Sequence, residues 1–87
     1  MIYPIINLNG SSAQELAEQY HKACVACEDA IQVMAVTFPH GRDYQTAPRD
    51  HYLMARVEHE ERIKMLTEVS RQLSLLRGHC YSSASGD

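Results

Sequence analysis

The chain has 87 residues, of which 45% are hydrophobic and 22% charged, and its formal net charge is -3. This balance predicts one folded domain, but a domain of this size is marginal unless it is cross-linked, binds a metal or self-associates. The negative charge argues against a broad surface for duplex nucleic acid, which needs a basic field. Three cysteines are an odd number, which disfavours a secreted disulfide framework and favours reduced thiols.

Neither membrane insertion nor export is indicated by the sequence. The chain contains no apolar run long enough to span a membrane, and its first residues lack the basic start and the cleavage pattern of a signal peptide. We therefore expect a cytoplasmic protein without a membrane partner.

Residues 1–11 are expected to form an extended arm. Pro4 disfavours a helix start, and Gly10 is a turn former. The arm also carries aliphatic side chains, including Ile5 and Ile6, that need a cover. We expect it to lie across the helices of its own chain or of a neighbouring subunit, with a frayed terminus as the alternative.

A first helix is predicted at about residues 12–37. Ser12 followed by Glu15 is a capping box, and an apolar stripe with three- and four-residue spacing begins directly after it. Phe38 precedes Pro39 and is therefore disfavoured in helical geometry, so the helix should end near this point. The stripe comprises Leu16, Tyr20, Ala23, Cys27, Ile31 and Met34.

A hinge at residues 38–47, where Gly41 allows a reversal, leads to a second helix at about residues 48–77. Gly78 is a fitting stop, and residues 80–87 are expected to form a flexible tail. The apolar stripe of this helix comprises Tyr52, Ala55, His59, Ile63, Leu66, Val69, Leu73 and Leu76. Its polar side is expected to carry Arg56 and the ion pairs Glu58 with Arg62 and Glu60 with Lys64.

The predicted fold is all-α: an antiparallel two-helix hairpin over residues 12–79 with an extended N-terminal arm, completed by homo-oligomerisation into a helical bundle. Two helices that touch along one seam leave much of each stripe in water, and a four-helix arrangement closes it. A twofold homodimer is the smallest assembly that we expect. The residues assigned to the oligomer interface are Ile5, Ile6, Leu16, Tyr20, Cys27, Met34, Tyr52, His59, Ile63, Leu66 and Leu73.

A metal site and an enzyme activity are both disfavoured. Cys24 and Cys27 form a C-x-x-C motif, and antiparallel folding is expected to bring Cys27 opposite Glu58 and His59, which gives an apparent zinc cluster. Structural zinc requires four ligands, however, and no fourth one is placed nearby. We therefore interpret the cysteines as buried packing residues and His59 as a core histidine bonded to a partner side chain or to its symmetry mate. No nucleophilic triad, helical zinc-protease motif or phosphate-binding glycine loop is present in the sequence, so we expect neither an enzyme nor a cofactor.

The hinge is the candidate surface for a ligand or partner. Arginine binds phosphate bidentately and tyrosine stacks on bases, so this segment could hold a nucleotide, another small anionic ligand or an acidic partner patch. Asp43 would oppose an anion. In the competing interpretation, Arg42 and Asp43 brace the loop while Tyr44 plugs the end of the bundle. The candidate residues are His40, Arg42, Asp43, Tyr44, Arg49 and His51.

Two short segments carry a resemblance to known proteins: Asn7-Leu8-Asn9-Gly10-Ser11-Ser12 in the arm and Gly41-Arg42-Asp43-Tyr44 in the hinge. With them, residues 5–77 resemble a group of small accessory proteins encoded by tailed bacteriophages. Such proteins often counter host defence, either by plugging a surface of a defence complex or by sequestering a nucleotide immune signal. The resemblance implies that the protein acts in the cytoplasm of the host cell.

The leading functional hypothesis is a non-enzymatic phage accessory protein that inhibits a host defence protein by occupying it. Its acidic outer face, with Glu58, Glu61 and Glu68, or its hinge would make the contact. One alternative is a sponge that sequesters a cyclic-nucleotide immune signal at the hinge. The other is a structural or virion-associated helical bundle protein, which would bind no small molecule.

Overall fold

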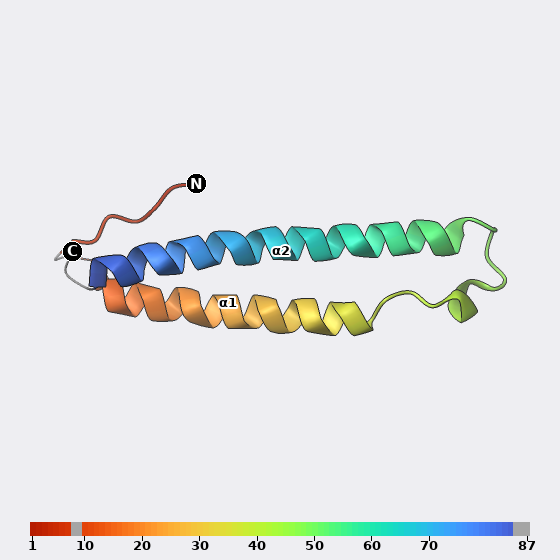
Figure 1. Ribbon diagram of the computed structural model, residues 1–87, viewed down its shortest axis with the longest axis horizontal. Helices are drawn as coiled ribbons and strands as arrows, with labels where there is room; N and C mark the ends of the chain where they lie inside the picture. The colour runs from red at the N-terminus through yellow and green to blue at the C-terminus, as the bar shows by residue number, and fades with distance from the viewer. Residues whose placement is uncertain (8–9, 85–87) are drawn as a thin grey trace.

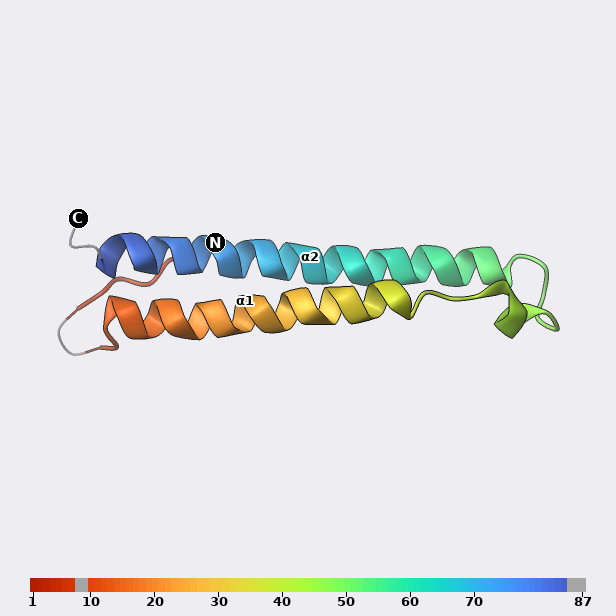
Figure 2. The ribbon, with the colours of Figure 1, turned by 60° about the horizontal axis from the view of Figure 1, so that its bottom comes forward.

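The computed structural model describes residues 1–7 and 10–84 and contains two long helices, α1 (Ala13–Val36) and α2 (His51–Ala84), with the short 3-10 helix η1 (Gly41–Tyr44) between them. The helices lie side by side and run antiparallel, in a hairpin that measures 61 × 20 × 19 Å (Figures 1 and 2). No strand occurs in the described part of the chain. The prediction of an all-α antiparallel hairpin is confirmed.

The ends of α1 agree with the sequence prediction. Ser12 is the N-cap, and its Oγ accepts a hydrogen bond from the Glu15 N–H at 3.1 Å. Thr37 is the C-cap; its N–H donates to the Met34 carbonyl at 3.2 Å and its Oγ1 donates to the Val33 carbonyl at 2.6 Å. These bonds satisfy backbone groups that a helix terminus otherwise leaves unpaired.

The second helix departs from the prediction mainly at its C-terminal end. Helix α2 begins at His51 rather than near residue 48, and it continues through Gly78 to Ala84. The predicted flexible tail therefore starts too early, since Cys80 is helical and 0% exposed. A glycine inside a helix costs only about 1 kcal/mol, which tertiary packing of the following turn can outweigh. Residues 85–87, the rest of the predicted tail, lie outside the described residues.

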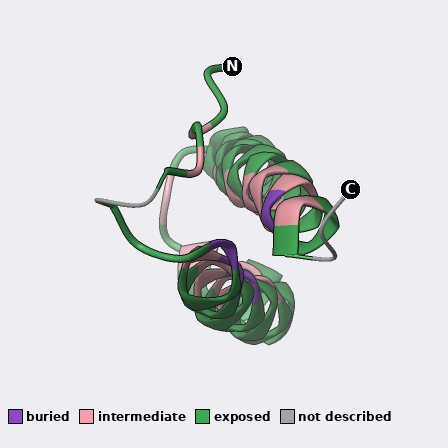
Figure 3. Cartoon of the chain, turned by 90° about the vertical axis from the view of Figure 1, so that its left-hand side faces the viewer, coloured by how far each residue is buried: buried purple, intermediate pink, exposed green. Residues whose placement is uncertain are grey.

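The core between the helices is thin and, apart from His59, built from small side chains. Its buried members are Ala13, Ala17, Cys24, His59 and Cys80. The buried stretches that are visible in Figure 3, in purple, lie on the facing sides of the two helices. Small residues let two helix backbones approach closely, but they bury little apolar surface. The hairpin therefore holds together along a narrow seam.

The helical residues that the sequence assigned to an oligomer interface contribute to this seam within one chain. His59 is buried, and the others are half-buried. The two stripes face each other because the hinge tethers the helices of one chain side by side. These residues therefore hold the two helices of one chain together.

The arm docks on the last turns of α2 of its own chain, which was one of its two predicted placements. The Tyr3 and His79 rings lie 4.9 Å apart, and the His79 Nε2–H donates to the Pro4 carbonyl at 3.0 Å. Ile6 is half-buried, whereas Ile2 and Ile5 are 93% and 88% exposed. The arm thus covers part of α2 and leaves two aliphatic side chains in solvent.

Candidate functional site

The hinge joins the helices by a series of tight turns. The Asp43 N–H donates to the His40 carbonyl at 3.0 Å within η1, the Ala47 N–H donates to the Tyr44 carbonyl at 3.1 Å, and a further turn closes at His51. Gly41 lies against Tyr52, since a Cβ at this glycine would lie 3.7 Å from the ring. The first turn of α2 and the hinge therefore pack on each other.

Aromatic rings and one guanidinium gather where the hinge meets α2. The Tyr44 and Tyr52 ring centroids lie 6.0 Å apart, and the Arg56 guanidinium lies 5.7 Å from the Phe38 ring centroid and 5.9 Å from that of Tyr52. A cation over an aromatic face at this distance is attracted by the ring quadrupole. Sequence reasoning missed this cluster because it assigned Arg56 to the polar side of α2, although its position one turn after Tyr52 was a signal.

The predicted ligand residues are only partly brought together. Tyr44 and His51 line one open hollow of about 240 Å³, together with Met54, Ala55 and Glu58. The other four candidates, which are His40, Arg42, Asp43 and Arg49, are exposed around the turn and do not line this hollow.

The hinge arginines are not engaged by the chain itself. Within residues 1–7 and 10–84, neither Arg42 nor Arg49 takes part in an ion pair or in a side-chain hydrogen bond. Asp43 contributes its backbone N–H to the turn, but its carboxylate forms no salt bridge with Arg42. The bracing contact between Arg42 and Asp43, which was the competing interpretation, is therefore not observed.

His59 lies where the hinge meets the seam between the helices. Its side chain is 7% exposed, its Nε2–H donates to the Met34 carbonyl at 2.6 Å, and its ring meets the Phe38 ring edge-on at a centroid distance of 4.8 Å. The prediction of a core histidine is confirmed, but its partner is a backbone carbonyl rather than a side chain. This bond requires a proton on Nε2 and therefore excludes the neutral tautomer that is protonated at Nδ1 alone.

The apparent Cys–His cluster does not form. Met34 lies opposite His59 and His21 lies opposite Arg77, so Cys27 faces a part of α2 that lies closer to its C-terminus than His59 does. The predicted register was wrong because the connection between the helices is longer than expected, with α1 ending at Val36 and α2 beginning at His51. The first part of this connection lies against the first turns of α2, where Phe38 contacts His59 and Tyr44 lies near Tyr52. No group of three His, Cys, Asp or Glu side chains that could hold a metal occurs among the described residues.

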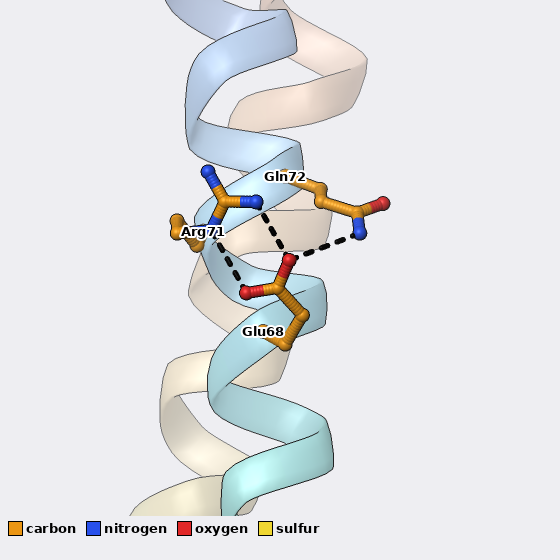
Figure 4. Close-up of polar contacts among 3 residues, drawn as sticks. All are labelled: Glu68, Arg71 and Gln72. Atoms are coloured by element: carbon orange, nitrogen blue, oxygen red, sulfur yellow. Dashed lines mark hydrogen bonds and ion pairs between the residues drawn. The ribbon is translucent and has the colours of Figure 1, made fainter. Parts of the chain in front are cut away.

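The acidic outer side of α2 is partly neutralised by its own cations. Glu68 accepts hydrogen bonds from Arg71 at 2.6 and 2.8 Å and from Gln72 at 3.2 Å (Figure 4). These bonds, those from Arg71 first, lower the pKa of Glu68 from 4.5 to about 2. Lys64 pairs with Glu61 at 3.4 Å rather than with Glu60, and the predicted pair of Glu58 with Arg62 is not formed.

At the open end of the hairpin, which is the end opposite the hinge, histidines link the two helices and hold the arm. The Arg77 Nη1–H donates to His21 Nδ1 at 3.0 Å, which links α2 to α1, and His79 holds the arm. A histidine nitrogen that accepts a hydrogen bond is unprotonated, so this bond requires the neutral form of His21. The side chains of His21, Arg77 and His79 are thus bonded within the chain.

Comparison with protein-family models, with curated proteins and with solved structures gave no significant match. None of the helices in the described residues has the length and apolar character needed to cross a membrane.

Proposed function

We propose that the chain is a non-enzymatic phage accessory protein that acts by occupancy against a host defence system, and that it sequesters a nucleotide signal at the hinge of a self-associated hairpin. The single observation that carries this proposal is that Arg42 and Arg49 form no side-chain bond within the described residues, in the hinge segment that also packs Tyr44 near Tyr52.

The chemistry of the hinge fits a ligand that carries both phosphate and base. Free guanidinium groups at Arg42 and Arg49 can bind phosphate oxygens bidentately. Tyr44 is half-buried against Tyr52 and can present a ring for stacking. Asp43 and Glu58 are nearby carboxylates that oppose an anion, so more than one guanidinium is needed at the site. A second copy of the hinge would supply further guanidinium groups.

The acidic outer face gives less support to an inhibitor that mimics nucleic-acid charge. Two of its three carboxylates, those of Glu61 and Glu68, already pair with Lys64 and Arg71 of the same helix. Their charge would therefore act on a basic partner groove only after these pairs rearranged. This difference between hinge and outer face favours the sponge over the inhibitor by charge mimicry.

Thermal shift and titration calorimetry with cyclic dinucleotides and trinucleotides test the proposal. A ligand that binds only the folded protein stabilises it by RT ln(1 + c/Kd), where c is the free ligand concentration, so the unfolding temperature rises with the logarithm of c once c exceeds Kd. We expect the Arg42→Ala/Arg49→Ala variant to lose this shift while its helical content and its oligomeric state stay unchanged.

The matched control is Lys22→Ala/Lys64→Ala, which removes the same amount of positive charge away from the hinge. This control should bind as the wild type does. If no cyclic nucleotide shifts the wild type, or if both double variants lose affinity equally, the hinge is not a nucleotide site.

A second candidate function, direct inhibition of a host protein, is favoured by a different observation. Leu53, Met54 and Val57 are 62%, 54% and 57% exposed and line an open apolar hollow of about 300 Å³ on α2. Such exposed side chains are typical anchors of a protein contact. If this function holds, Leu53→Glu should abolish counter-defence activity in cells, whereas the Arg42→Ala/Arg49→Ala variant should retain it.

A further inference from the structure

The hairpin exposes more surface than a folded monomer of its mass should. Its accessible surface is 6522 Å², whereas the scaling law for compact monomers gives about 5,200 Å² for 9.9 kDa. The surplus of about 1,300 Å² exceeds the roughly 800 Å² per partner that a stable protein interface buries. The area available is therefore sufficient for a stable contact with another molecule.

Part of this surplus is apolar and gathers on one flank of the seam, which we call the apolar face. Val33, Met54, Met65 and Val69 are 62%, 54%, 61% and 46% exposed, and Ala26 and Ala30 lie beside them on α1 at helical spacing from Val33. The apolar face consists of Ala26, Ala30, Val33, Met54, Met65 and Val69.

Helix geometry places these six residues on the same side of the hairpin. On each helix they lie on one flank of the seam in the same rotational sense, with Val69 at the edge of the predicted stripe and Met54 and Met65 farther around the axis. Two antiparallel helices that face each other bring flanks of the same sense to the same side of the pair. The bond of His59 to the Met34 carbonyl fixes the register, so that Val33 lies near the level of residue 60 on α2.

The two ends of the apolar face are limited by features of the same chain. Toward the hinge, Met54 also lines the hollow that Tyr44 and His51 share. Toward the open end, the arm docks on His79. The uncovered stretch of α2 thus runs from Met54 to Val69 and is centred near residue 61.

Two charged side chains lie on either side of the centre of this stretch. Glu58 and Arg62 lie one helical turn apart, and neither takes part in an ion pair or side-chain hydrogen bond in the part of the chain that the structure describes. If two copies met with α2 antiparallel to α2 about a twofold axis between these residues, each Glu58 would oppose the Arg62 of the other copy. The same axis would superpose the two apolar stretches.

We propose that the occupant of the apolar face is the apolar face of a second copy, packed antiparallel about a twofold axis near residue 60, with Glu58 of each copy paired with Arg62 of the other. This inference rests on the self-association that the proposed function includes, and it assigns that association to a surface other than the seam stripes. Twofold contacts between identical patches are the commonest way in which soluble chains associate.

A charge-exchange experiment tests this geometry. Glu58→Arg places two pairs of arginines in opposition across the axis, and Arg62→Glu places two pairs of glutamates in opposition. Each variant alone should dimerise at least tenfold more weakly than the wild type in sedimentation equilibrium. An equal mixture of the two variants should recover the wild-type dimer as a heterodimer, which also shows that both variants are folded.

The variants Met65→Glu and Val25→Glu distinguish disruption of the apolar face from a general decrease in surface hydrophobicity. Met65→Glu should yield monomers, whereas Val25→Glu, on a 41% exposed side chain on the far side of α1 from the seam, should leave the dimer intact. A monomeric wild type would overturn self-association as a whole. A wild-type oligomer that Met65→Glu does not affect, or variants whose mixture fails to associate, would overturn only this packing and would leave the nucleotide proposal to its own test.

Discussion

The two ends of the hairpin use polar side chains in opposite ways. At the open end, His21 and Arg77 bond to each other across the helices and His79 holds the Pro4 carbonyl. At the hinge, Arg42 and Arg49 are exposed and unbonded within the described chain. The same residue types therefore close the structure at one end and remain available for a ligand at the other.

Replacing His59 should have the largest effect on stability, because this side chain separates the hinge from the closed seam. His59→Ala leaves a cavity against Phe38 and removes the donor to the Met34 carbonyl. We expect the free energy of unfolding to fall by about 2 to 4 kcal/mol in urea denaturation. The exposed His51→Ala should change it by less than about 0.5 kcal/mol, and equal losses in the two variants would mean that His59 has no special role.

Cys80→Ser should weaken the open end by an intermediate amount. Cys80 is 0% exposed in the turns of α2 that follow Gly78, and a hydroxyl there would be buried in apolar surroundings. The free energy of unfolding should fall by about 1 to 2 kcal/mol. Cys27→Ser, at a half-buried position, should cost less. If Cys80→Ser were neutral, the last turns of α2 would contribute nothing to the closure of this end.

Tyr3→Ala tests how firmly the arm is held. The ring contact with His79 should contribute about 0.5 to 1.5 kcal/mol. Hydrogen exchange of the amides near His79 should accelerate in this variant while amides of the hinge keep their rates. Ile2→Ala, at a 93% exposed side chain, is the control and should leave exchange unchanged.

The smallest effect is expected from the ion pair of Glu68 with Arg71. Because the pKa of Glu68 is lowered to about 2, the pair stabilises the folded state above the unfolded-state pKa of 4.5 and loses this contribution as the pH falls toward 2. Both side chains are exposed, so the change in stability should be slight. An NMR titration of the Glu68 carboxyl should show a midpoint near 2, and Arg71→Ala should raise it; an unchanged midpoint would contradict the pairing.

Local signals in the sequence predicted local structure well. The Ser12 and Glu15 pattern located the start of α1, and the Phe38-Pro39 step located its end, because both depend on neighbours in the chain. The two stripes with helical spacing predicted the hairpin itself. These features follow from helix geometry and from backbone sterics alone.

Features that depend on the path of the hinge were not predicted. The pairing of His59 with Met34 and the position of Arg56 over Phe38 depend on how many residues the turns between α1 and α2 contain. The sequence does not give this number. The end of α2 depends on the burial of Cys80 at the far end of the hairpin, which outweighs the local signal of Gly78. Of the six residues predicted for a ligand site, Tyr44 and His51 line the hollow beside Met54, and the other four do not.

The most direct test of the difference between the two ends is an amide NMR titration of the wild-type protein with cyclic nucleotides. If the hinge binds the ligand, saturable shifts should occur at amides between His40 and Arg56, while amides of Ala13–Cys24 and of the last turns of α2 should not move. Shifts that gather at the open end, or none at any ligand concentration, would contradict the assignment of the binding capacity to the hinge.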